Sequence, residues 1–351
     1  MMAEVIFLLV IGLLLGSYLW WGIRTLPQER WQVLASVPVR KKAGGDWSGV
    51  NLTWYGLFTA NAYAVAMSAL FMLMGTVRVP LAGTVALAAI MLFACVPASR
   101  LVARVVEKKA HTFTVGGAVF VGVLLAPWIV LLVNRTLGEE LSFHISPGAA
   151  LAAFAIAYTF GEGLGRLACL SFGCCYGKPL TEVPLWLRRM LAGASVSFYG
   201  KTKKIAYAGG LEGKRVLPVQ ALTAAIYTGC GLAATLLFLR GHFVGAFMSA
   251  MIVTQGWRVL SEALRADYRG GGKVSAYQVM GVVAIVYGGA AMLLAPGAVP
   301  VHPDSSGALA AFAQPAAIFF LQAIWLVIFF YTGRSTVTGA TICFHVHQHR
   351  I

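Results

Sequence analysis

The sequence has few charged residues and very few acidic ones. Of its 351 residues, 11% are charged, and 12 acidic residues stand against 27 basic ones. An ordinary soluble domain is about 25% charged, so this scarcity excludes a water-soluble enzyme of this size. It also excludes a disordered protein and a secreted disulfide scaffold. The class that remains is a multi-pass helical membrane protein.

Long apolar runs are what the sequence has in abundance, and 59% of its residues are hydrophobic. A helix needs about 20 apolar residues to cross the hydrocarbon core of a membrane. We therefore predict an all-α fold, a multi-pass integral membrane bundle of about nine helices. The first run is followed, not preceded, by basic residues, which favours an uncleaved anchor over a signal peptide. The expected spans are 5–23, 52–75, 79–98, 112–133, 148–172, 217–239, 244–264, 275–295 and 311–332.

The basic residues are placed asymmetrically. If loops alternate between the two sides of a membrane, one side carries only Arg78, Arg135 and Arg240, and Arg166 and Arg258 lie within spans. The other side then holds 22 of the 27 basic residues. An excess of Lys and Arg normally marks the cytoplasmic side. The net charge of +15 is therefore interpreted as a topology signal, with an anionic lipid surface as a secondary reading and no nucleic-acid partner.

We divide the chain into three parts. Residues 1–51 are an N-terminal membrane anchor and basic linker, 52–295 a seven-helix membrane core, and 296–351 a C-terminal helix with a polar tail. The core contains one long loop, 173–216, that is too polar to span. Its mixture of apolar and basic residues is typical of a segment that lies on the headgroup region. We expect it to cap the bundle.

The cysteines carry little predicted chemistry. Three of the six, Cys169 among them, lie within expected spans, where they are interpreted as small apolar fillers. The adjacent Cys174 and Cys175 are interpreted as packing residues at a tight turn, with metal binding or redox chemistry left open. The tail 343–349 alternates cysteine and histidine but has no second cluster beside it. We predict no metal site.

Charged side chains within the expected spans are the first functional candidates, because a charge at membrane depth is costly. Glu162 and Arg166 are four residues apart and share one helix face. Arg258, Glu262 and Arg265 follow each other at helical spacing in another span. Guanidinium groups in this arrangement can hold a phosphate through paired hydrogen bonds. We favour a phospholipid headgroup site; the alternative is an internal ladder of ion pairs.

These residues also carry a resemblance to a known family. The stretch Gly-Arg-Leu-Ala-Cys-Leu-Ser-Phe-Gly-Cys-Cys-Tyr-Gly-Lys-Pro over 165–179 resembles the signature of bacterial prolipoprotein diacylglyceryl transferases, in a divergent Gly-Cys-Cys-Tyr-Gly form. Order and spacing of the further matches hold over about 52–295, and the first and last spans are extra. These matches are Trp54-Tyr55-Gly56-Leu57, Ser99-Arg100, Val115-Gly116-Gly117, Leu217-Pro218-Val219-Gln220, the segment Gln255 to Arg265, and Val274-Ser275 with Gln278.

The resemblance implies a transferase that moves the diacylglyceryl group of phosphatidylglycerol to a lipobox cysteine and releases glycerol phosphate. It needs no cofactor, and its partners are membrane lipids and a prolipoprotein. Carried over, Arg166 and Arg258 bind the phosphate, Glu262 orients Arg258, Arg265 extends the cradle and Tyr55 hydrogen-bonds the substrate. The further substrate-binding candidates are Arg100, Gly116, Gly117, Glu162 and Gln220.

Several positions depart from the family's pattern. Its two histidines are Val115 and Leu217 here, so the usual base that activates a thiol is missing. His111, about one helical turn before Val115, is the candidate replacement. Cys169 and Cys174 stand where the family has asparagine and glutamate. These changes leave the lipid side of the reaction recognisable and the acceptor side altered.

The sequence leaves the sidedness open. The resemblance implies a bacterial inner membrane protein with its capping loop outside, whereas the charge rule places that loop in the cytoplasm. Two other functions stay as alternatives. One is a phospholipid-binding protein, or a transferase with another acceptor. The other is a small-anion transporter, disfavoured because no pair of interrupted spans is seen.

Overall fold

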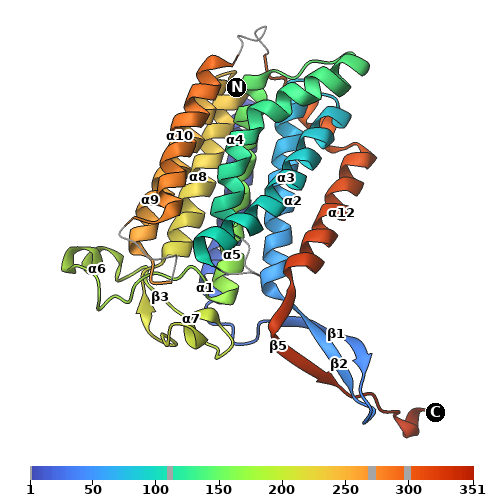
Figure 1. Cartoon of the computed structure of the whole chain (residues 1–351), viewed down its shortest axis with the longest axis vertical. Helices are drawn as coiled ribbons and strands as arrows, with labels where there is room; N and C mark the ends of the chain where they lie inside the picture. The colour runs from blue at the N-terminus through green and yellow to red at the C-terminus, as the bar shows by residue number, and fades with distance from the viewer. Residues whose placement is uncertain (1, 109–113, 268–273, 296–301) are drawn as a thin grey trace.

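The computed structural model describes residues 2–108, 114–267, 274–295 and 302–351. Within these ranges, eight helices are long and apolar enough to cross a membrane, which confirms the all-α multi-pass bundle (Figure 1). They correspond to eight of the nine expected spans. Their bounds are α1 (Met2–Thr25), α2 (Trp54–Thr76), α3 (Leu81–Glu107), α4 (Val115–Val133), α8 (Val219–Leu239), α9 (Phe243–Leu264), α10 (Ala276–Leu294) and α12 (Pro315–Thr332).

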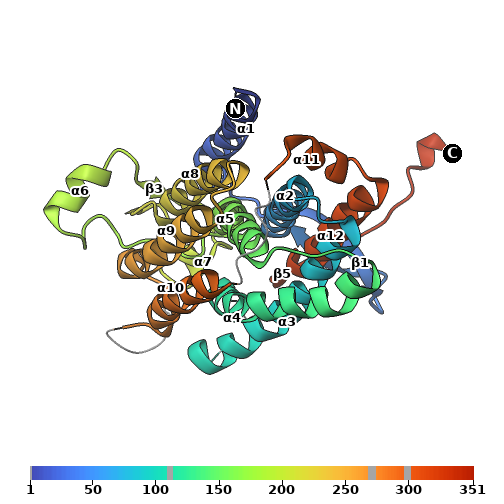
Figure 2. The same ribbon diagram turned by 90° about the horizontal axis from the view of Figure 1, so that it is seen from above.

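The ninth expected span is the helix α5 (Pro147–Phe172) at the centre of the bundle. It carries Glu162 and Arg166 in its second half. Figure 2 shows α5 between α2 on one side and α8 and α9 on the other. Its first half is rich in alanine, and these small side chains are buried, which lets the neighbouring helices pack close to its backbone. The central position explains why its charges are shielded.

Shorter elements connect the helices. The chain between α4 and α5 forms a π-helical turn, η1 (Asn134–Gly138). The short helix α11 (Ser305–Phe312) begins at Asp304, whose side chain accepts a hydrogen bond from the Ser306 backbone N–H. Helix α11 approaches α2 closely at Gly307 and Gly75, where a Cβ on either glycine would collide with the other's carbonyl group.

The linker and the tail form a sheet that the sequence did not reveal. Strands β1 (Val33–Lys41), β2 (Trp47–Thr53) and β5 (Arg334–Ile342) pair antiparallel in the order β1-β2-β5. The buried Asn51 side chain accepts from Ser36 Oγ and donates to the Thr338 carbonyl, so it bonds to both neighbouring strands. Parts of the expected linker and tail thus form paired strands, and the tail ends in a short 3-10 turn, η2 (Gln348–Arg350).

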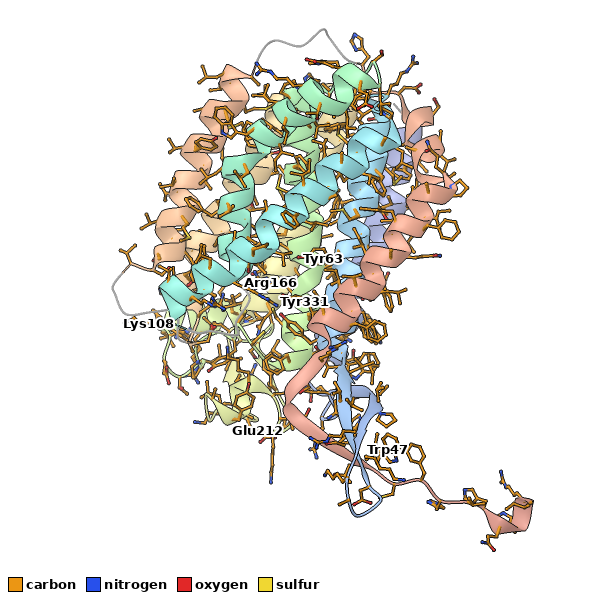
Figure 3. The ribbon with its side chains drawn as sticks, turned by 45° about the vertical axis from the view of Figure 1, so that its right-hand side comes forward. Trp47, Tyr63, Lys108, Arg166, Glu212 and Tyr331 are labelled. Carbon is orange, nitrogen blue, oxygen red and sulfur yellow. The ribbon has the colours of Figure 1, made fainter. Side chains whose placement is uncertain are left out.

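The capping loop 173–216 is folded over one end of the bundle (Figure 1). It contains α6 (Leu185–Leu191), β3 (Val196–Ser197), α7 (Lys204–Tyr207) and β4 (Arg215–Val216), with β3 and β4 paired. The fully buried Lys203 fastens it, because its Nζ donates to the carbonyls of Leu26 (2.9 Å) and Ser171 (2.7 Å). Figure 3 shows that Glu212 of this loop, Trp47 of the sheet and Lys108 lie toward the same end as Arg166.

Candidate functional site

One buried carboxylate lies between two arginines at the centre of the site. Glu162 Oε1 pairs with Arg166 Nη2 on the same helix, α5, and lies 3.5 Å from Arg258 Nη2 on α9. The three side chains are only 4%, 15% and 11% exposed, respectively. Helical spacing brings Glu162 to Arg166, and helix packing adds Arg258. One carboxylate against two guanidiniums leaves this group, the Glu162 cluster, with one excess positive charge.

Tyr158 completes the surroundings of Arg258. The Arg258 Nη2 donates to Tyr158 Oη at 2.8 Å, and the Tyr158 ring meets that of Tyr227 edge-on at 6.3 Å. Sequence analysis missed Tyr158. Its signal was its spacing, because it precedes Glu162 by four residues and so shares the charged face of α5.

Two donors of the Glu162 cluster have no protein acceptor. Within the described part of the chain, the Nε atoms of Arg166 and Arg258 are buried and have no hydrogen-bond partner. Buried N–H groups are paired in the great majority of cases. These two donors are therefore available to an acceptor outside the protein, such as an oxyanion. The anion site expected from the sequence stays a prediction.

Gly116 is part of the wall of this site. A Cβ built there would lie 2.7 Å from Arg258 Nη1 and 2.7 Å from the Tyr277 ring, so the absence of a side chain lets Arg258 reach its position. Gly117, expected beside it in a binding role, instead faces the Val102 side chain of α3. Only the first of the two expected glycines thus contacts the arginines.

Arg265 belongs to a second group. Its Nη1 is 3.3 Å from Glu262 Oε1, and it makes two bonds to the Asp267 carboxylate, at 2.8 and 2.7 Å. Arg258 forms its ion pair with Glu162, and the expected role of Glu262 in orienting Arg258 stays a prediction. Two carboxylates pair with Arg265, and the buried donors without a partner among the described residues are on Arg166 and Arg258. Asp267 was missed because it lies beyond the end of α9, where helical spacing no longer applies.

The end of α5 turns back on itself and gathers three cysteines. The Sγ atoms of Cys169, Cys174 and Cys175 lie within 4.8 Å of one another. Cys169 also lies beside the Glu162 cluster, since its Sγ is 4.0 Å from Arg166 Nη1. Gln220 donates to the Cys174 carbonyl at 2.8 Å. The turn expected at the cysteine pair is present, but the approach of Cys169 to it was not predicted.

The remaining expected residues are dispersed. The Tyr55 ring packs edge-on against Phe172 at 5.8 Å, beside the cysteine turn. The exposed Arg100 lies over the Tyr331 ring of α12 at 5.1 Å, and no contact with the Glu162 cluster is found for it among the described residues. His111 lies outside the described residues.

The family model for prolipoprotein diacylglyceryl transferase matches residues 46–294. The match covers more than half of the chain and includes both charged groups, the cysteine turn and the capping loop. The chain belongs to the prolipoprotein diacylglyceryl transferase family. No curated protein matches the chain in a direct search. Family membership makes the protein a membrane transferase.

Within this transferase, the segments outside the match pack onto the matched part. Gly12 of α1 approaches the Leu232 side chain of α8, and α12 approaches α2 at Gly56. The division into 1–51, 52–295 and 296–351 stays a prediction. At the two positions where the resemblance expects histidine, Val115 is 41% exposed and Leu217 is buried.

Proposed function

We propose that the protein transfers the diacylglyceryl group of phosphatidylglycerol to the cysteine thiol of a prolipoprotein lipobox and releases glycerol phosphate. The observation that carries this proposal is the Glu162 cluster, with its one excess positive charge and two buried, unpaired Nε donors. A phosphodiester carries one negative charge and acceptor oxygens, and it matches the cluster in both respects. The membrane-embedded position suits a lipid donor.

The arginines have a role in the reaction beyond binding. Attack of a thiolate on the glyceryl carbon breaks its bond to a phosphate oxygen, and the leaving glycerol phosphate gains a second negative charge. Arg166 and Arg258 would stabilise this developing charge, which is the kind of interaction that accelerates a reaction because it strengthens in the transition state. Glu162 holds both guanidiniums in place. Arg265, paired with two carboxylates, positions the end of α9.

The test uses the purified full chain in phosphatidylglycerol vesicles with a lipobox peptide, following glycerol phosphate release. Loss of a donor to a developing oxyanion typically costs about 10²–10³ in rate, so Arg166→Ala and Arg258→Ala should each slow release by at least 100-fold. Arg240→Ala, at an exposed position between α8 and α9, is the matched control and should keep the full rate. Release that ignores phosphatidylglycerol or the peptide's cysteine would refute the proposal.

The second candidate is a phospholipid-binding protein or a transferase with another acceptor, and it allows a site that faces the cytoplasm. It is favoured by the histidine positions, since Val115 and Leu217 supply no base. Its mark would be phosphatidylglycerol that co-purifies with the wild-type protein and is lost in Arg258→Ala, while no lipobox peptide is modified. A bacterial inner membrane location is part of both proposals.

A further inference from the structure

The three cysteines of the α5 turn form a cluster with the dimensions of a metal site. Their Sγ atoms all lie within 4.8 Å of one another, and those of Cys169 and Cys175 are 3.8 Å apart. Zinc binds thiolate sulfur at about 2.3 Å in tetrahedral geometry, which puts neighbouring sulfurs about 3.8 Å apart. One edge of the cluster already has this length, and the others need a contraction of at most about an ångström.

The backbone is shaped to bring these sulfurs together. Gly173 ends α5 in the left-handed conformation, with φ +68°, and Cys174 N–H bonds back to the Cys169 carbonyl at 3.1 Å. Cys175 also has a positive φ, +57°. A residue with a side chain adopts this region at a cost, and such strain concentrates at functional sites. The strained turn therefore has a candidate purpose in aiming Cys175 at Cys169.

The cysteine cluster adjoins the Glu162 cluster. Arg166 Nη1 lies 4.0 Å from Cys169 Sγ, so a guanidinium of the proposed phosphate site also faces the sulfur cluster. Three thiolates with one divalent ion carry a single net negative charge, and Arg166 places a cation beside them. The cluster and the lipid headgroup site therefore share a side chain and are neighbours.

The acceptor thiol needs activation at this place, and no described histidine provides it. His144, His242 and His302 belong to loops at the end of the bundle opposite the capping loop, and the three other described histidines lie in the tail after β5. A thiol must lose its proton before it attacks carbon, because the thiolate is the nucleophile. A metal ion with an open position can replace a base, since a coordinating thiol is deprotonated outright.

We infer that Cys169, Cys174 and Cys175 hold a thiophilic divalent metal ion of the zinc type, with a fourth position open for the acceptor cysteine. Three protein ligands and one exchangeable position are the pattern of catalytic zinc sites. The inference rests on the proposed function for the identity of the acceptor. It assigns the cysteine turn a role that packing alone does not require.

The reaction balances without an oxidant or reductant. The acceptor thiol binds the metal and releases its proton to water. The bound thiolate sulfur then forms a bond to the carbon of the diacylglyceryl group that carries the phosphate. The bond from that carbon to the phosphate oxygen breaks, and its electron pair stays on the oxygen. The products are a thioether, which binds the metal more weakly than a thiolate, and glycerol phosphate with two negative charges beside Arg166 and Arg258.

The first experiment measures metal binding on the full chain, independently of activity. The reduced protein in detergent is stripped with a chelator, dialysed against Zn²⁺ and assayed for bound zinc. We expect one zinc per chain, with an affinity at least about tenfold lower in Cys169→Ser and Cys175→Ser, since loss of even an outer-shell partner costs that much. Cys95→Ser and Cys230→Ser, in α3 and α8, are the matched controls and should bind as the wild type.

The second experiment uses Co²⁺ as a spectroscopic probe of the open position. Adding a lipobox peptide should strengthen the sulfur-to-cobalt charge-transfer band, because a fourth sulfur enters the coordination sphere. A peptide with serine in place of the cysteine should leave the band unchanged. A cobalt spectrum that is indifferent to the peptide thiol would overturn the assigned role.

Other outcomes separate this inference from the proposed function. Zinc binding that survives Cys169→Ser but is lost when Cys343 and the tail histidines are replaced would overturn the site. Transfer that proceeds without metal, tolerates Cys175→Ser and requires His111 would also overturn it, while leaving the proposed function intact. Zinc and peptide binding through the cluster without glycerol phosphate release would support the metal site and refute the transfer reaction.

Discussion

At the scale of single residues, the fold concentrates its buried charge in two small groups near the end of α5. In the Glu162 cluster one carboxylate forms ion pairs with two arginines, and in the Arg265 group two carboxylates form ion pairs with one arginine. Burying a charge is tolerable only when it is paired and hydrogen-bonded. The first group has Nε donors without a partner among the described residues, which a ligand can accept from. In the second group the donors of Arg265 bond to Glu262 and Asp267.

The first residue-scale prediction concerns Glu162. Glu162→Gln keeps the shape but leaves Arg166 and Arg258 as two neighbouring buried cations, and breaking a buried pair in this way costs about 3–5 kcal/mol. We expect a lower thermal unfolding midpoint in detergent and at least a tenfold loss of glycerol phosphate release. The control is Glu139→Gln, at an exposed position after η1, where neither quantity should change. An unaltered midpoint for Glu162→Gln would show that the two guanidiniums do not need their shared carboxylate.

The second residue-scale prediction concerns the pH dependence set by Lys203. Burial lowers the pKa of Lys203 to about 8 from its usual 10.5. Between these values the unfolded chain binds more protons than the folded one, so the contribution of Lys203 to stability rises with pH there. We expect the unfolding midpoint of the wild type, relative to Lys203→Met, to increase from pH 8 to pH 10.5. A difference that is flat or falls over this range would contradict the lowered pKa.

Helical spacing predicts the ion pair within α5 but not the contact between α5 and α9. Glu162 and Arg166 share a face and are paired, as their spacing indicates. Arg258 and Glu262 have the same spacing, yet Arg258 lies near Glu162 on another helix. Periodicity along one helix cannot weigh a partner from a second helix. The approach of Cys169 to the turn after its own helix could not be predicted either, because helical spacing ends where the helix ends.

At the scale of elements, long helices were predictable and the sheet was not. A span announces itself by a long apolar run, which is a local property of the chain. Strand β2 pairs with β5 across more than 280 residues of sequence, and neither segment carries a signal that names the other. The polar composition of 24–51 indicates a linker, because the alternation of apolar and polar residues in so short a segment is a weak signal for a strand.

The element-scale prediction tests how α12 and the sheet are docked. At Gly56 of α2, a Cβ would lie 2.7 Å from the Gly333 backbone nitrogen and 3.0 Å from the Phe329 carbonyl. Gly56→Ala should therefore push α12 and the start of β5 away, with a loss of about 1–3 kcal/mol from overpacking. Gly229→Ala in α8, where no atom lies within 4 Å of the built Cβ, should be neutral or stabilising. The measurement is the unfolding midpoint of both variants; equal midpoints would refute the close packing at Gly56.

At the scale of the whole molecule, the capping loop, the sheet and the C-terminal ends of α3 and α9 lie at one end of the bundle (Figure 1). The alternation of basic loops predicted this common side. Some of the basic residues there make contacts within the fold. Lys203 holds two carbonyls, Arg215 bonds to Ala192 and Ser195, and Arg24 lies over Trp20. Charge that is bound in this way is a weaker signal of orientation than free charge in a loop.

The last prediction decides which side of the membrane this end faces. Transfer to an exported prolipoprotein requires the outer face, so an impermeant maleimide should label Cys343, in the exposed tail, in intact cells. A hydrogen bond to Asp46 raises the pKa of the Cys343 thiol, so the labelling is run at mildly alkaline pH, with Cys343→Ser as the background. Labelling only after permeabilisation would place this end of the bundle in the cytoplasm, as the charge rule predicts. It would also exclude exported lipobox peptides as acceptors.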